Sequence, residues 1–521
     1  MKKLLLPLLG VFAAFPSLAQ DFYCPVNDYA SLGYNIVDES AKTCEVCIFE
    51  KNPNVDAPER YDIVIPSQVK YGDNEYTVVA IGRSVFMSYA LSSISIPSTV
   101  TKIGEMAFYS NYSYGKEMEK AEFASIEHLC SIDFGDYYSN PAGDAKALYF
   151  AGEKVTDIVV PNTITEIKDY AFCQCNIARI NIPSSVTSIG KSAFYRCMSL
   201  TSINIPSSVT SIGETAFYRC TSLRRVEFES LESLCNIDFC GADSNPLSCG
   251  QYLYVGGEEI KNLVIPNTVK EIKDYVFSGC SKLTSIDIPN SVITIGESSF
   301  SDCSNVKVLN ISESVTSIGA NAFSSCGITS VVIPNSLTSI ADDVFRRCPI
   351  TSVVIPNAVT TIGDRAFASC SLTSIVIPDS VTSIGDYAFS GCPLTSVEIG
   401  KNVTYIGKGN FASRNLQTVK VYAVNPPEIE SEGQFLDDTY DYATLYVPVG
   451  SESDYEAHAC WGFFRNIETF DPDASIDGIE AGDVGCEVYT IGGLKVGDRI
   501  DGLPKGVYIL RKGSTVTKMA I

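Results

Sequence analysis

"LTSIVIPDSVTSIGDYAFSGC", residues 372–392, is the stretch that decides the fold of this chain. Its apolar residues follow neither the two-residue period of a strand nor the 3.6-residue period of a helix throughout. The first part, "LTSIVIP", predicts a short strand with Ile375 and Ile377 on one face, and the proline ends its hydrogen-bond ladder. "SVTSIG" then turns the chain back, and "DYAF" predicts a tight turn that buries its alanine and phenylalanine.

The same pattern recurs along most of the chain at nearly constant spacing. Its phenylalanine returns every 22 or 23 residues, apart from two gaps of 64 and 60 residues. The positions are Phe86, Phe108, Phe172, Phe194, Phe217, Phe277, Phe300, Phe323, Phe345, Phe367, Phe389 and Phe411. A fixed period of this length is typical of a solenoid, in which each repeat is one coil that is stable only when its neighbours cover it. The sequence therefore predicts a mostly β solenoid of 22–23-residue coils with terminal caps.

The predicted solenoid covers residues 61–422 and contains two enlarged coils. Residues 121–160 and 226–265 match each other at a constant offset of 105 residues, and each holds a stretch of helical spacing followed by an "SNP" loop. The loops are interpreted either as functional loops or as spacers. Residues 21–60 are expected to cap one end and residues 423–470 the other, with the single tryptophan, Trp461, as an anchor of the second cap.

The motif "IPxSVTSIGxxAFxxC", together with an L-x-x-I-x-I strand, resembles the BspA-type bacterial surface leucine-rich repeat family over residues 61–422. This resemblance implies a leucine-rich-repeat solenoid, surface display and binding to host or bacterial partners, and it implies no catalytic residues. The expected function is that of an adhesin or binding scaffold for a host matrix protein, a mucin or another bacterium. The alternative is a structural or glycan-capturing cell-envelope protein without a host protein ligand.

The two ends of the chain predict export. Residues 1–20 have a basic start, an apolar run and a small-residue cleavage site, which are typical of a signal peptide. Residues 474–521 contain "VYTIGGLKV" and "LPKGVYIL", which resemble the small C-terminal β-domain that directs type IX secretion. The expected location is the extracellular space or the outer cell surface after Sec export, with the periplasm as the alternative. The mature chain is expected to lack a membrane-spanning segment and to be a monomer.

Charge and motifs argue against several classes of function. The chain has 38 Lys and Arg against 61 Asp and Glu, a net charge of −23, which argues against nucleic acid as a partner. It has two histidines, and no nucleophile, phosphate-loop or calcium-loop motif is present. We therefore expect no enzyme activity, no cofactor and no catalytic or metal-binding residue, and an extracellular protein or glycan as the partner.

The 19 cysteines fall into different groups. Nine of them lie three residues after a repeat phenylalanine, and parallel Cβ vectors on stacked coils would hold their sulfurs too far apart for disulfides. These nine are expected to be buried free thiols. Cys240 and Cys249 are both absent from the first enlarged coil, where Gly135 and Asp144 stand, so we predict a disulfide between them. Cys44 and Cys47 lie near Cys24, and a bridge within the N-terminal cap is expected there.

The residue between the two inward positions of each strand is expected to point outward at the same place on every coil. Three consecutive coils place an apolar residue there and a serine two positions earlier. This set, the valine stripe, consists of Val332, Val354 and Val376 with Ser330, Ser352 and Ser374. It is interpreted either as a protein-docking patch or as an effect of the strand propensity of valine alone.

Overall fold

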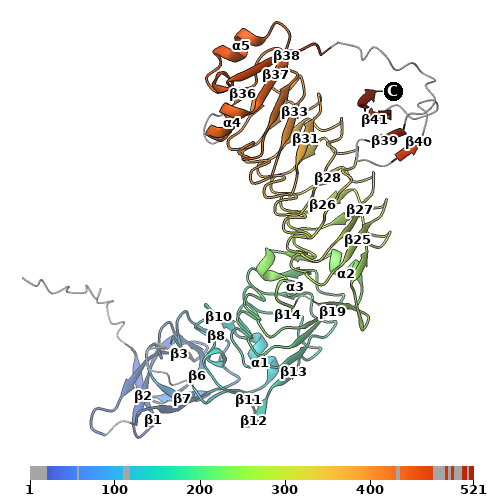
Figure 1. Cartoon of the computed structure of the whole chain (residues 1–521). Helices are drawn as coiled ribbons and strands as arrows, with labels where there is room; N and C mark the ends of the chain where they lie inside the picture. Colours follow the sequence, from blue (N-terminus) through green and yellow to red (C-terminus); the bar gives the residue numbers. More distant parts are fainter. Residues whose placement is uncertain are drawn as a thin grey trace, which may run out of the picture. The chain divides into compact units, whose positions relative to one another are not determined.

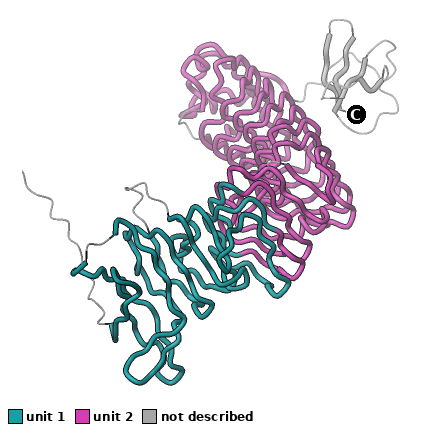
Figure 2. Tube along the Cα trace, turned by 90° about the horizontal axis from the view of Figure 1, so that it is seen from below, with its two compact units in different colours: residues 1–180, 190–199 teal, residues 181–189, 200–521 magenta. Residues whose placement is uncertain are grey.

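The computed structural model of the chain describes residues 20–55, 58–109, 118–250, 252–429 and 434–472, together with four strands between residues 487 and 520. The predicted signal peptide lies outside the described residues, except for Gln20. The chain divides into two compact units (Figure 2). Unit 1 comprises residues 1–180 and 190–199, and unit 2 comprises residues 181–189 and 200–521.

Each coil follows the path that the repeat predicts. In β31 (Ser374–Ile377) the two isoleucines are buried, whereas Ser374 and Val376 are exposed. The next coil adds β33 (Ser396–Ile399) in parallel, with Val376 opposite Glu398. Parallel in-register pairing gives every coil the same inward and outward positions, and the mostly β solenoid predicted from the sequence is confirmed (Figure 1).

Two kinds of strand recur, a long strand at the start of each coil and a two-residue strand after the proline turn. The long strands of unit 1 are β4 (Tyr61–Val64), β7 (Leu91–Ile96), β9 (Lys120–Phe123), β11 (Leu148–Phe150), β12 (Glu153–Val155) and β13 (Asp157–Val159). Its short strands are β8 (Lys102–Ile103), β10 (Asp133–Phe134) and β14 (Glu166–Ile167). Between the enlarged coils also lie β15 (Arg179–Asn181) and β16 (Ser188–Ile189).

Unit 2 continues both series. Its other long strands are β17 (Ser202–Ile205), β19 (Arg225–Phe228), β21 (Leu253–Val255), β23 (Asn262–Val264), β25 (Ser285–Ile288), β27 (Val308–Ile311) and β35 (Thr418–Val421). The two-residue β22 (Glu258–Glu259) pairs with β21 in an antiparallel hairpin. Its short strands are β18 (Ser211–Ile212), β20 (Asp238–Phe239), β24 (Glu271–Ile272), β26 (Thr294–Ile295), β28 (Ser317–Ile318), β29 (Ser339–Ile340), β30 (Thr361–Ile362), β32 (Ser383–Ile384), β34 (Tyr405–Ile406) and β36 (Glu428–Ile429).

The turn phenylalanines form the centre of the core. In unit 2 the rings from Phe277 to Phe435 stack one on the next, with neighbouring centroids 5.2 to 6.1 Å apart. Backbone bonds join the same turns, as where Phe367 N–H donates to the Ala388 carbonyl at 2.8 Å. The position two residues before most of these phenylalanines has positive φ without being glycine, for example +57° at Tyr387. Such a conformation is strained for a residue with a Cβ, and it recurs because the stacked turns hold it in place.

The glycine of "SIG" is explained by the close approach of neighbouring coils. Asp364 Oδ1 accepts a hydrogen bond from Asp386 N–H at 2.7 Å. A Cβ on Gly385 would lie 2.4 Å from Asp364 Oδ1 and 2.7 Å from Asp364 N. Any side chain at Gly385 would therefore force the two coils apart.

The enlarged coils each contain a short helix and a buried asparagine. The helices are α1 (Ile126–Ser131) and η2 (Pro141–Gly143) in the first enlarged coil, and α2 (Leu231–Cys235), η3 (Ala242–Ser244) and α3 (Leu247–Gly250) in the second. In the second, the Asn245 amide donates to the carbonyls of Tyr275 at 2.7 Å and Val276 at 2.9 Å. Asn140 makes the same two bonds in the first. The "SNP" loop therefore fixes the enlarged coil to the following turn.

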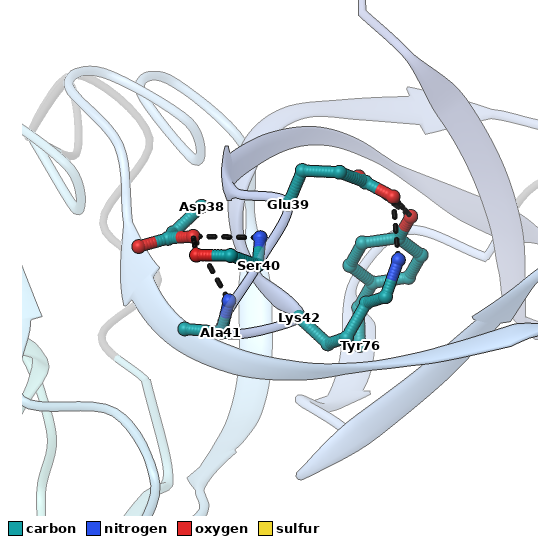
Figure 3. A network of polar contacts seen from close by, with 6 residues as sticks. All are labelled: Asp38, Glu39, Ser40, Ala41, Lys42 and Tyr76. Carbon is teal, nitrogen blue, oxygen red and sulfur yellow. Dashed lines mark hydrogen bonds and ion pairs between the residues drawn. The ribbon is translucent and has the colours of Figure 1, made fainter.

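The N-terminal residues form a sheet that joins the first coils. Its strands are β1 (Phe22–Asn27), β2 (Ala30–Asp38), β3 (Thr43–Lys51), β5 (Gln68–Tyr71) and β6 (Asn74–Ile81). The pairs β1–β2, β2–β3 and β5–β6 are antiparallel, whereas β3 pairs with β6 in parallel. Figure 3 shows the turn between β2 and β3, where Asp38 Oδ1 accepts from Ser40 N–H at 2.8 Å and Ala41 N–H at 2.9 Å. Glu39 contacts Lys42 at 2.5 Å and accepts from the Tyr76 hydroxyl at 2.8 Å, which fixes the turn to β6.

The other end of the solenoid is covered around Trp461. The covering elements are α4 (Asp437–Tyr442), β37 (Thr444–Pro448), α5 (Glu452–Ala457), η4 (Trp461–Phe463) and β38 (Asn466–Phe470). The Trp461 side chain is fully buried, and its indole N–H donates to the Pro427 carbonyl at 3.0 Å. Its ring lies 5.8 Å from that of Phe435, the last ring of the stack.

The C-terminal residues form a separate small sheet. Its antiparallel strands, in spatial order, are β40 (Lys495–Gly497), β39 (Glu487–Thr490), β41 (Val507–Lys512) and β42 (Thr515–Ala520). The rest of the predicted domain 474–521 lies outside the described residues.

Candidate binding surface

The valine stripe lies on the outer face of unit 2. The exposed fractions are 76% for Val332, 49% for Val354 and 37% for Val376, so all three side chains face solvent. The neighbouring Ser330, Ser352 and Ser374 are also exposed. Val376 and Ser374 belong to β31, and Ser330 pairs with Ser352 in an isolated parallel bridge.

Charged and aromatic groups border the stripe on its C-terminal side. Glu398 stands opposite Val376, and Lys420 stands opposite Glu398. The Lys420 ammonium lies 4.8 Å from the ring centre of Tyr422 and 4.1 Å from that of Phe470. The Tyr422 hydroxyl donates to Glu398 at 3.1 Å. The stripe is therefore an apolar and hydroxyl surface with a fixed polar edge.

The thiols of the repeat are structural. They are buried, and several donate to the carbonyl of the phenylalanine one coil earlier, as from Cys348 Sγ to Phe323 at 3.0 Å and from Cys392 Sγ to Phe367 at 3.2 Å. Burial raises the pKa of the Cys348 thiol above its ordinary value. These residues are free thiols, as the spacing of the repeat predicted.

The disulfide predicted between Cys240 and Cys249 is not formed in the structure, where both are free thiols. Cys249 Sγ donates to the Phe217 carbonyl at 3.2 Å, so in the enlarged coil it takes the same role as the other repeat thiols. Cys240 is exposed. Cys24, Cys44 and Cys47 are likewise free, and the bridge expected in the N-terminal cap is absent. Sequence reasoning missed the structural role of Cys249 because its distance from Phe217 differs from that in the regular repeat.

A shallow pocket of about 490 Å³ lies at the second enlarged coil, and apart from Cys249 its residues were not singled out by the sequence. Its lining residues are Thr221, Arg224, Ser248, Cys249 and Tyr252. The Lys282 ammonium lies 5.3 Å from the ring centre of Tyr252, and Arg224 is exposed. At the matching positions the first enlarged coil has Glu119 and Ala147, so the two duplicated coils differ in charge here.

Histidine, cysteine and carboxylate side chains are dispersed over the residues that the structure describes. Within them, no three His, Cys, Asp or Glu side chains are placed to hold a metal ion. In the same part of the chain, no helix has the length and apolarity needed to cross a bilayer. His128 is buried in α1, with Nε2 2.8 Å from the Val100 carbonyl and Nδ1 without a partner. It therefore packs in the core of the first enlarged coil.

His128 predicts an acid-sensitive stability of unit 1. Burial lowers the pKa of His128, although its bond to Val100 raises it in part. An unfolded histidine binds a proton near pH 6.5, whereas the folded chain keeps His128 neutral to lower pH, so stability decreases as the pH falls below about 6.5. The expected loss is at most about 1.4 kcal/mol per pH unit. Denaturant unfolding between pH 7 and 5 measures it.

The control for this prediction is His128→Ser, because Ser233 occupies the matching position of the second enlarged coil. Between pH 6.5 and 5, the free energy of unfolding of the variant should fall less steeply than that of the wild type. Its value at pH 7 does not enter the comparison. An unchanged slope in the variant would show that His128 is not responsible.

Comparison with known proteins gives a family match. Residues 67–135, 146–242, 233–350 and 338–432 match the family described as BspA type leucine rich repeat region, with six copies. No curated protein matches the chain. A solved leucine rich cell surface protein from Faecalibacterium prausnitzii A2-165 is 25% identical, with a TM-score of 0.43 and coverage of 75% of this chain and 95% of that chain. A leucine-rich repeat protein from Bacteroides ovatus ATCC 8483 is 22% identical, with a TM-score of 0.43 and coverage of 87% and 100%.

Proposed function

This chain belongs to the BspA type leucine-rich repeat family, and we propose that it acts as a non-enzymatic binding scaffold that docks an extracellular protein on the valine stripe. The observation that supports this most directly is the exposure of Val332, Val354 and Val376 on consecutive coils. A single exposed valine is ordinary on a sheet, whereas three in a row beside hydroxyls form a continuous patch. The partner would be a host matrix protein, a mucin or a protein of another bacterium.

The proposal includes display outside the cell. The basic and apolar start of the chain supports Sec export, and the family supports a surface or secreted location. We further propose that the C-terminal sheet, β39 to β42, is the sorting segment that directs type IX secretion. Removing residues 474–521 should then retain the chain inside the outer membrane.

A second candidate function is glycan capture without a protein ligand. The pocket beside Arg224 supports it, because an arginine, a tyrosine ring and hydroxyls are groups that bind sugars. Under this alternative the ligand would contact the second enlarged coil and leave the valine stripe free.

The test is a binding assay of the secreted chain against matrix proteins, mucins and glycans. The triple change Val332→Lys, Val354→Lys and Val376→Lys should reduce binding of the protein ligand about 100-fold or more, because charge replaces the apolar centre of the interface. Surface changes of this kind usually alter stability by no more than about 0.5 kcal/mol each, so the melting temperature should change little.

The matched control is Val264→Lys, an exposed valine at the equivalent position of β23, far along the chain from the stripe. It should leave binding unchanged. A protein ligand that binds the triple variant as well as the wild type would contradict the proposal. A glycan ligand lost on Arg224→Glu, the charge found in the first enlarged coil, would favour the second candidate instead.

A further inference from the structure

The hydrogen-bond ladder between coils is interrupted inside unit 2. One long-strand sheet, β23-β25-β27, ends at Ile311, and the next, β31-β33-β35-β37-β38, begins at Ser374. In the two coils between them, only Ser330 and Ser352 form an isolated bridge. The short-strand sheets stop at the same place, since β24-β26-β28 ends at Ile318 and β29-β30-β32-β34-β36 begins at Ser339. We call the step between β28 and β29 the seam.

The turn side of the seam remains bonded. Phe323 N–H donates to the Val344 carbonyl at 3.0 Å, and Ser325 N–H donates to the Arg346 carbonyl at 2.7 Å. Cys348 Sγ also reaches the Phe323 carbonyl across the same step. On the opposite side, the Glu313 carboxylate accepts from Asn335 N–H at 2.8 Å. The two coils are therefore joined by backbone bonds along one edge and mainly by side-chain bonds elsewhere.

A change in coil length accompanies the break in the ladder. Before the seam the long strand begins five residues after the repeat cysteine, as from Cys303 to Val308, and after it the equivalent position follows by four residues, as from Cys326 to Ser330. The change in length does not break a ladder by itself, because β15 begins four residues after Cys175 and β17 five residues after Cys197, and these two strands remain paired. The shortened linker is also tight, because a Cβ on Gly327 would lie 2.3 Å from the Ser304 carbonyl oxygen.

The core is less well covered at the seam than elsewhere. Ile311 and Ile318 face inward but are partly exposed. Their equivalents one coil earlier, Ile288 and Ile295, are 2% and 1% exposed. An incompletely covered apolar side chain and a missing ladder both lower the free energy needed to open a structure locally.

We propose that the seam is a site of local opening, at which the two adjoining coils of unit 2 separate reversibly while its other coils stay closed. Opening would separate β28 from β29 and expose Ile311 and Ile318 beneath the coil that carries Val332. The proposal concerns motion of the coils and holds whether or not the valine stripe binds a protein.

The buried thiols provide a reporter at nearly every step of the stack. Cys326 lies on one side of the seam and Cys348 on the other, and both are buried in the closed structure. We expect alkylation of the native full chain, followed by mass mapping, to label these two about 10-fold or more faster than Cys303 and Cys392, which lie where the ladders are continuous. Equal rates at all four thiols would indicate opening by global unfolding and would overturn the proposal.

One variant sharpens the test. Glu313→Ala removes the side-chain bond to Asn335 and should increase labelling of Cys326 and Cys348 several-fold while Cys303 is unchanged. Unchanged labelling of Cys326 and Cys348 in the folded variant would contradict the role of this bond in closing the seam.

Discussion

Trp461→Ala is expected to destabilise the C-terminal cap by about 3–5 kcal/mol, the usual cost of removing a large buried aromatic side chain. Trp461 is fully buried and lies between the rings of Phe435 and Tyr455, at 5.8 and 5.9 Å. The change also leaves the buried Pro427 carbonyl without its indole donor. Because a solenoid coil depends on the coil that covers it, the loss should spread to the last coils of unit 2.

Hydrogen exchange of the wild type and the variant measures this effect locally. Amides of β35 and β37 should exchange faster in Trp461→Ala, whereas those of β25, several coils away, should be unchanged. Trp461→Phe is the matched control, since it keeps an aromatic ring but loses the bond to Pro427, and it should cost about 1–3 kcal/mol. Equal exchange in the wild type and the alanine variant would show that Trp461 does not hold the cap.

The regular coil was predictable because its signals are local and repeated. The alternation of Ile375 and Ile377 with Ser374 and Val376 gives the direction of each side chain as soon as a strand is assumed. The position of the cysteines after the phenylalanines likewise predicted buried thiols, and Cys348 is one. The repeat strengthens this prediction, because the side-chain directions assigned in one coil must also place apolar residues inward in the other coils.

Other features could not be read from the sequence because they depend on contacts between coils. Tyr387 has positive φ, a conformation that a sequence signals through glycine or asparagine, and here neither is used. The partner of Cys249 is Phe217, 32 residues earlier, whereas in a regular coil the bonded phenylalanine lies 25 or 26 residues earlier, as for Cys348 and Cys303. The seam is a gap in the pairing between coils, and it appears only when neighbouring strands are placed side by side.

The sequence predicted which residues of the candidate binding surface point outward, but it did not predict which side chains border that surface. The outward direction of Val332 follows from strand alternation, and the structure places it in solvent. The polar edge formed by Lys420 with Tyr422 and Phe470 depends on two strands and a cap that meet only in the fold. The pocket beside Arg224 likewise needs residues from separate parts of the enlarged coil.

Asn245→Ala is expected to destabilise unit 2 by about 2–5 kcal/mol, because buried polar groups that lose their partners cost about 1–3 kcal/mol each. The Asn245 side chain is fully buried, and its amide is the donor for the carbonyls of Tyr275 and Val276. Its Oδ1 accepts from Leu247 N–H at 2.9 Å. Alanine removes all three bonds at once, and the cavity it leaves lies between the enlarged coil and the next turn.

The duplication of the enlarged coil supplies the comparison that decides this prediction. Asn140→Ala removes the same two amide bonds in unit 1, so each variant should speed hydrogen exchange in its own unit and leave the other unit unchanged. Asp243→Ala, at an exposed position of the same loop as Asn245, should change the free energy of unfolding by less than about 0.5 kcal/mol. If Asn245→Ala is as mild as Asp243→Ala, the "SNP" loop does not fix the enlarged coil, and its interpretation as a functional loop gains support.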